Sequence, residues 1–206
     1  MRKTVCLLPC LFAGLMLIIS HAKANTTLEK IQHTMAKPEM LCGKFNQKKI
    51  LSGFKSALNS DGRFCVHANK GIIWQTLKPF PNTLHLTKNE ITQWQGDRVI
   101  MRMDAQREPA IQMINNVLFS LIAGDFSQLE KLFQAESRIK DNKWHVALKA
   151  KDRGLSKAIE RISLNGDAYV RDISINEASG DKTHIVFSDI QIDNATKIWG
   201  EIFVHQ

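Results

Sequence analysis

Short runs in which apolar and polar residues alternate extend from residue 41 to residue 103, and this alternation limits the possible folds more than any other feature of the sequence. Every second residue is apolar from Gly62 to Ala68, and a polar side chain likewise separates Leu84 from Leu86. Successive side chains of a β-strand point to opposite faces of a sheet. Turn residues separate the runs, so the pattern predicts an antiparallel sheet with one apolar face.

Two stretches depart from this pattern and have the apolar spacing of amphipathic helices. Residues 26–36 carry apolar side chains three and four positions apart and are followed by Pro38, which predicts a short helix. Between residues 108 and 135 the spacing predicts two more helices, the first beginning at Pro109 and the second at Asp125. The second of these helices is expected to bury Phe126, Leu129, Leu132 and Phe133.

The alternation of strands returns from Trp144 to Ile190, with a hairpin turn predicted at Asn165-Gly166. Helices that lie between two sets of strands indicate an α+β fold, in which the helices cover one face of the sheet. No low-complexity linker interrupts the chain, and its length suits one domain. We place this single domain at residues 25–206.

The first residues of the chain have the order of a secretory signal. Positive residues at 2–3 precede an uncharged apolar run at 5–20, and small residues follow in Ala22–Ala24. This order predicts a signal peptide at residues 1–24 that is cleaved before Asn25. An uncleaved membrane anchor is the alternative, although the run is shorter than the roughly 20 residues that span a bilayer comfortably. We therefore expect an exported protein that acts outside the cytoplasm.

The charge balance of the chain is mildly basic. The precursor has 28 Lys and Arg residues and 20 Asp and Glu residues, for a net charge of +8. Three of the basic residues and none of the acidic residues precede Asn25, which leaves a net charge of +5. This surplus could favour anionic lipid headgroups or an acidic partner, but it is spread along the chain and a solvated surface is the simpler interpretation. No cluster resembles a nucleic-acid site, so no nucleic-acid partner is expected.

Cys42 and Cys65 are the two cysteines that remain after the predicted cleavage. A hairpin that turns near Ser52–Phe54 would place them directly opposite each other. An even number of cysteines in an oxidising compartment favours a disulfide, which would constrain the unfolded chain by roughly 3 kcal/mol in the loop-entropy model. Two free thiols are the alternative, because the register of the hairpin is itself inferred.

The sequence has none of the motifs that mark common enzyme classes: no G-x-S-x-G, H-E-x-x-H, phosphate-binding Gly-rich loop or C-x-x-C. The histidines are isolated and most fall on the polar sides of strands, so we expect surface histidines rather than metal ligands. A hydrolase would require several of His67, His85 and His145 to converge with acids in one pocket. We therefore expect no enzymatic activity, no metal and no cofactor.

The apolar sides of the predicted strands and helices define one inward-facing set. It comprises Phe45, Phe64, Val66, Ile72, Trp74, Leu84, Leu86, Met101, Met103, Met113, Val117 and Leu118. Such a set is usually a packed hydrophobic core. The alternative is a cavity loose enough for an acyl chain, to which flexible methionine side chains would adapt. The residues alone leave both interpretations open.

Several short motifs follow one another in a fixed order. They are F-x-Q at Phe45–Gln47, G-R-F at Gly62–Phe64, W-x-T-x-x-P at Trp74–Pro79 and a further strand at Leu84–Thr87. Together with the predicted helices, this order over residues 28–190 resembles the LolA family of periplasmic lipoprotein carriers. The resemblance implies an incomplete antiparallel β-barrel, that is a strongly curved sheet, covered by an N-terminal helix and a mid-chain helical pair that act as a lid.

The same resemblance implies a monomeric shuttle without catalytic activity. It would take acyl chains of lipoproteins, or of another envelope lipid, from an inner-membrane exporter to an outer-membrane acceptor. A periplasmic adaptor that binds a protein partner without lipid is the alternative. On this resemblance we expect the inward-facing set, Val117 aside, to line the acyl-chain cavity. Where the family has an arginine that ties the lid shut, this sequence has Ala68, so we expect the lid to be held differently.

Overall fold

The computed structural model describes residues 25–104, 107, 112, 116, 117, 119, 120 and 126–192. The predicted signal peptide at residues 1–24 and the predicted lining residues Met113 and Leu118 lie outside the described residues. None of the helices that the structure describes is long and apolar enough to cross a membrane.

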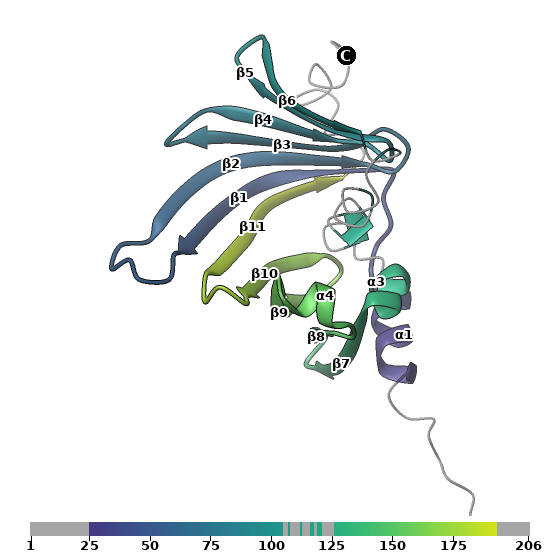
Figure 1. Cartoon of the computed structure of the whole chain (residues 1–206). Helices are drawn as coiled ribbons and strands as arrows, with labels where there is room; N and C mark the ends of the chain where they lie inside the picture. Colours follow the sequence, from purple (N-terminus) through teal and green to yellow (C-terminus); the bar gives the residue numbers. More distant parts are fainter. Residues whose placement is uncertain are drawn as a thin grey trace, which may run out of the picture.

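One antiparallel sheet of 11 strands dominates the structure, in the order β6-β5-β4-β3-β2-β1-β11-β10-β9-β8-β7 (Figure 1). The strands are β1 Met40–Ile50, β2 Leu58–His67, β3 Gly71–Lys78, β4 Asn82–Leu86, β5 Glu90–Gln95, β6 Arg98–Asp104, β7 Phe133–Lys140, β8 Lys143–Ala150, β9 Ile159–Gly166, β10 Val170–Glu177 and β11 Lys182–Ile192. Strands β6 and β7 are the two edges, while β1 and β11 pair in the middle. The sheet therefore curves without closing, which confirms the predicted incomplete barrel.

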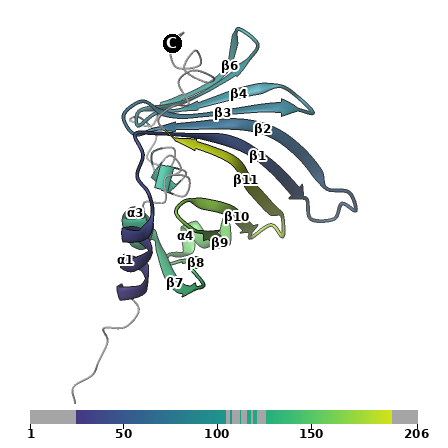
Figure 2. The ribbon, with the colours of Figure 1, turned by 180° about the vertical axis from the view of Figure 1, so that it is seen from behind.

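The sheet is accompanied by helices α1 Asn25–Thr34, α3 Phe126–Leu132 and α4 Arg153–Ser156. The predicted N-terminal helix is confirmed, since Leu28, Ile31 and Met35 are buried as their spacing requires. Helix α1 packs against β7, and helix α3 lies beside it (Figures 1 and 2). In the stretch predicted as the first mid-chain helix, the described residues 112, 116, 117, 119 and 120 are helical.

The two faces of the sheet differ in character. We call the face that carries Phe45, Ile72 and Val146 the inner face, and the opposite one the outer face. Helices α1 and α3 pack against the inner face through Leu28 and Phe126, both at most 2% exposed. The inner face is thus the apolar face that the alternation predicted, and the helices cover it as expected.

The register of the β1–β2 hairpin is also confirmed. Cys42 faces Cys65 and Phe45 faces Gly62, as a turn at Ser52–Phe54 requires. In this register, Phe64 and Trp74 fall on the inner face together, because directly paired residues of neighbouring strands share a face.

Two local predictions are wrong, and two elements were not predicted. Phe133 is the first residue of β7 rather than the end of a helix, and strand β7 itself was not predicted. Asn165 and Gly166 lie within β9, where Gly166 pairs with Trp144, so the hairpin turns later, after Gly166. A β-carbon on Gly166 would lie 2.2 Å from the Trp144 ring, so this glycine makes room for a side chain instead of forming a turn. Helix α4 was also missed, although Asp152 caps it by accepting hydrogen bonds from two backbone N–H groups.

Candidate functional site: the apolar inner face

Four aromatic rings, one from each of the adjacent strands β3, β2, β1 and β11, meet near the middle of the inner face. Phe45 of β1 stacks on Trp74 of β3 with ring centroids 3.8 Å apart. Phe64 of β2 lies 4.8 Å from Phe187 of β11, and 6.0 Å from Trp74. Phe187 meets the edge of Trp74 at 6.1 Å. Tilted and offset contacts of this kind stabilise aromatic pairs beyond the area that they bury.

Gly62 allows this aromatic cluster to form. It lies on β2, between Phe45 on β1 and Thr76 on β3. A β-carbon on Gly62 would lie 2.1 Å from the carbonyl oxygen of Gln75 and 2.4 Å from the ring of Phe45. The Phe45 ring therefore crosses β2 above the glycine to reach Trp74, and no larger residue leaves the space for it.

The inner face divides into two apolar clusters. The larger one joins Phe45 and Phe64 to the helices and to strands β7 to β11. Its strand members beyond β2 are Phe133, Trp144, Val146, Leu148, Ile162, Leu164, Val170, Ile173 and Phe187. The smaller one centres on Ile72, Leu86 and Ile91, which are 6% exposed or less.

The smaller cluster is bordered by side chains that are only half-buried. These are Val66, Leu84, Met101, Met103 and Phe119. Val66, Leu84 and the two methionines lie on the inner face of β2, β4 and β6, and Phe119 is a helical residue; part of their apolar surface stays open. The larger cluster is packed tightly by comparison, with Val146, Ile162 and Leu164 fully buried.

Every described residue of the predicted lining set lies on the inner face. Phe45 and Phe64 belong to the larger cluster, with Trp74 packed against it; Ile72, Leu84, Leu86, Met101 and Met103 belong to or border the smaller one, and Val66 contacts both. The prediction missed the inner-face residues of β8 to β11. Their signal was present in the sequence, since Trp144, Val146 and Leu148 alternate, as do Ile185 and Phe187.

The two cysteines lie on the outer face of the sheet. A disulfide joins Cys42 and Cys65, whose Cα atoms are 4.1 Å apart across the β1–β2 pair. Both are at most 1% exposed, and Ile73 beside them is equally buried. Ala68 lies in the exposed turn between β2 and β3, where its N–H donates to the carbonyl of Glu39 at 3.0 Å. A methyl side chain in an exposed turn cannot tie a helix down by hydrogen bonds or charge.

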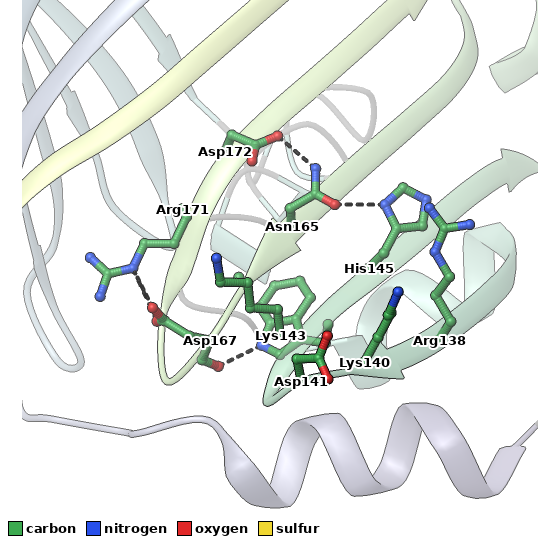
Figure 3. Close-up of a pocket in the computed structure, with 11 residues that line it drawn as sticks. Arg138, Lys140, Asp141, Lys143, His145, Asn165, Asp167, Arg171 and Asp172 are labelled. Carbon is green, nitrogen blue, oxygen red and sulfur yellow. Dashed lines mark hydrogen bonds and ion pairs between the residues drawn. The ribbon is translucent and has the colours of Figure 1, made fainter.

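A polar hollow of about 750 Å³ lies over the outer side of β7 to β10 (Figure 3). A chain of side chains crosses its floor from strand to strand. The Nδ1 of His145 lies 2.7 Å from Oδ1 of Asn165, whose amide donates to Asp172 at 2.8 Å. His184 on β11 extends the row, with its Nε2 3.7 Å from the same Asp172 carboxylate. This hollow opens on the face opposite the apolar clusters, and of the residues that line it Trp144 also belongs to the larger cluster.

An ion pair closes one end of the hollow. Arg171 donates from Nε to both oxygens of Asp167, at 3.0 and 2.9 Å, and its guanidinium lies 5.6 Å from the ring centre of Tyr169. Burial alone would raise the pKa of Asp167, but the hydrogen bond and charge of Arg171 and the backbone N–H groups of Tyr169 and Ala168 together lower the pKa below its usual value. The backbone oxygen of Asp167 also accepts from the Trp144 indole at 2.6 Å.

The histidines do not converge. His67 lies on β2 and His145 on β8, five strands apart in the sheet, which is roughly 24 Å along it at about 4.8 Å per strand. His85, on β4, is two strands further away. Among the described residues, no group of three or more His, Cys, Asp or Glu side chains could hold a metal ion. The hydrolase that would need these histidines together therefore has no support here.

The structure is an open, curved antiparallel sheet whose apolar inner face is covered by helices. The model of the family described as outer membrane lipoprotein carrier protein LolA matches residues 36–198, which places the chain among proteins of the lipoprotein-carrier type. The chain belongs to the LolA family, as the order of its motifs predicted.

The solved structures to which the chain is similar are distant from it in sequence. A LolA-superfamily protein from Nitrosomonas europaea is 10% identical, with a TM-score of 0.45 over 82% of this chain and 93% of its own. MucB from Pseudomonas aeruginosa, solved in complex with MucA, is 13% identical, with a TM-score of 0.48 over 84% of this chain and 58% of its own. A putative outer membrane lipoprotein-sorting domain from Vibrio parahaemolyticus is 10% identical, with a TM-score of 0.39 over 87% and 99%. No curated protein sequence matches the chain.

Proposed function

We propose that the protein is a periplasmic carrier that holds acyl chains of lipoproteins, or of another envelope lipid, against its inner face and delivers them toward the outer membrane. Membership of the LolA family supports the carrier class. The half-buried border of the smaller cluster supports an apolar ligand there, and it is the observation on which the proposal rests.

The gain from covering that border is large enough for a carrier. Leu84, Met101 and Met103 present apolar surface that tight packing would have removed from water. Each methylene of an acyl chain gains about 0.8 kcal/mol on burial, so about ten of them would supply about 8 kcal/mol, the free energy of a micromolar complex. Methionine side chains adapt to chains of different shape. A complex of this strength both protects the chain in water and permits its release.

Delivery also requires export and exchange partners. We propose that residues 1–24 direct export and are then removed, because an anchored form could not cross the compartment. An inner-membrane exporter would load the carrier and an outer-membrane acceptor would unload it. We propose that no reaction is catalysed and no metal or cofactor is required. With Ala68 at the position of the family's latch arginine, helix packing such as that of α1 against β7 would hold the cover in place.

Bound lipid is the direct test. Protein purified from periplasm should carry lipid in native mass spectrometry, and it should bind a fluorescent fatty acid that this lipid displaces. Leu84→Glu places a charge on the half-buried border and should reduce fatty-acid binding at least tenfold, because a charge facing an acyl chain is strongly unfavourable. Val186→Glu is the matched control, since Val186 is 41% exposed on the outer face of β11. Its fatty-acid binding should be unchanged.

The results separate this proposal from the adaptor alternative. Strand β6 is an edge of the sheet with Val99 and Ile100 exposed at 37% and 48%, a surface to which a protein partner could add a strand. An adaptor would co-purify with that partner and carry no lipid. A folded protein that neither contains lipid nor binds the fatty acid would refute acyl-chain carriage.

A further inference from the structure

Two hairpin loops at one end of the sheet hold its most exposed large apolar side chains. Phe54, in the β1–β2 loop, is 70% exposed, and Phe80, in the β3–β4 loop, is 78% exposed. Both loops lie at the same end of the sheet in both views (Figures 1 and 2). Ile50, Leu58 and Leu77 flank the loops, each between 41% and 58% exposed. We call these five residues the apolar rim.

The two loops are held in place by hydrogen bonds, so the rings are presented outward on an ordered base. The N–H of Ser52 donates to the carboxylate of Asp181 at 2.8 Å, which joins the β1–β2 loop to the β10–β11 turn. The N–H of Phe54 donates to the carbonyl of Leu51 at 3.1 Å. In the other loop, the side-chain amide of Asn82 donates to the carbonyl of Phe80 at 3.0 Å.

Exposed lysines accompany the rim. Lys48, Lys55 and Lys78 lie on the same strands and loops, and none makes an ion pair with another residue that the structure describes. Of the acids nearby, Glu177 and Asp181 both face Lys49, at 3.0 and 3.9 Å. Asp61, opposite Lys78 in the β2–β3 pair, accepts a hydrogen bond from Asn46 at 2.6 Å. The rim is therefore apolar at its tips and positively charged around them.

This combination fits the surface of an anionic bilayer. Phenylalanine and leucine side chains insert at the boundary between the headgroups and the acyl chains, and lysines extend from there to the phosphates. Each signal alone gives weak binding, and together they give reversible attachment. A binding groove for a protein would instead be a continuous surface, whereas Phe54 and Phe80 lie in two separate loops, β1–β2 and β3–β4.

We propose that the apolar rim docks the protein on membranes that contain anionic phospholipid, with Phe54 and Phe80 inserted among the headgroups and the lysines on the phosphates. The basic residues are spread along the sequence, but the fold brings Lys48, Lys55 and Lys78 to this end of the sheet, where they would contact the phosphates. Docking does not require an acyl chain on the inner face, because the rim residues are separate from both apolar clusters.

Flotation with lipid vesicles tests the proposal. The full protein purified from periplasm should float with vesicles of phosphatidylethanolamine and phosphatidylglycerol, and much less with vesicles of phosphatidylcholine. The double variant Phe54→Ser and Phe80→Ser should lower the affinity for anionic vesicles about tenfold. Added salt should weaken the binding of the unaltered protein. The matched control is Ile139→Ser with Val186→Ser, which removes two apolar side chains of 45% and 41% exposure away from the rim.

Three results would overturn the proposal. They are the absence of binding to anionic vesicles, equal binding to phosphatidylcholine, and unchanged binding by the Phe54→Ser and Phe80→Ser variant. If the unaltered protein binds no vesicles but binds a protein partner, and the variant loses that partner, the rim is a protein-binding site and the membrane proposal is wrong. The Leu84→Glu variant keeps this test independent of acyl-chain carriage, because it should lose fatty acid and still float.

Discussion

The disulfide between Cys42 and Cys65 links strand register, compartment and stability, and it can be perturbed in two ways. Reductant opens the bond once the unaltered protein unfolds, while the double variant Cys42→Ala and Cys65→Ala removes both sulfurs. Both cysteines are at most 1% exposed, so the native protein should resist reductant and lose the bond only when it unfolds.

The size of the effect follows from the loop that the bond closes. The two residues are 23 apart in the sequence. In the loop-entropy model this separation removes about 11 cal/mol/K from the unfolded chain, which is about 3.4 kcal/mol at 25 °C. The alanine variant also loses two buried sulfur atoms and should be less stable by a further 1–2 kcal/mol or so, because their space is only partly refilled.

Urea unfolding of the periplasmic protein at pH 7, with and without reductant, measures the difference. With about 2–3 kcal/mol/M expected for the denaturant dependence of a chain of this size, reduction should lower the midpoint by about 1–2 M. The alanine variant should unfold lower still and be insensitive to reductant. Equal midpoints with and without reductant, or two titratable thiols in the unfolded periplasmic protein, would refute the reasoning.

Three further predictions concern packing, charge and processing. Gly62→Ala should lower the free energy of unfolding in urea by about 1–3 kcal/mol, because the added methyl group displaces the Phe45 ring. It should also change the Trp fluorescence of the folded protein, since Phe45 would no longer stack on Trp74. Ser60→Ala on the same strand should have neither effect. Asp167→Asn should lower the melting temperature at pH 7. Because the pKa of Asp167 is depressed in the folded protein, the difference in melting temperature from the unaltered protein should shrink as the pH falls below about 4. A difference that stays constant with pH would contradict the assignment. N-terminal sequencing of the exported protein should begin at Asn25.

The half of the sheet that follows local sequence rules was predictable. A single turn fixes the register of a hairpin, so the position of Gly53 was enough to place Cys42 opposite Cys65. Strand β7 was missed for the opposite reason. It is an edge strand with small and polar residues such as Ala135 and Ser137 on its inner face, so its alternation is weak. It forms a strand because it pairs with β8, and the local sequence pattern does not show this pairing.

The candidate site was predictable only in part, because its full extent depends on a pairing between the two ends of the chain. Strand β11 joins β1 from far away in the sequence and brings Phe187 against Phe64. Nothing in the local pattern ranks Phe187 above other alternating residues. Gly166 shows the same limit: beside Asn165 it has the signature of a turn, but its conformation is decided by the Trp144 ring from β8.

The two clusters of the inner face explain how one sheet can be stable and still have apolar surface to spare. Strands β7 to β11 and the helices form a tightly packed core around residues such as Val146 and Leu164, and close packing of this kind supplies stability. Strands β3 to β6 face the same side, but Met101 and Met103 stay half-buried there. Because the two halves are joined through β1 and β2, losses of packing on the open side leave the core intact. A ligand that completes the open side would then gain binding energy without having to disturb the fold.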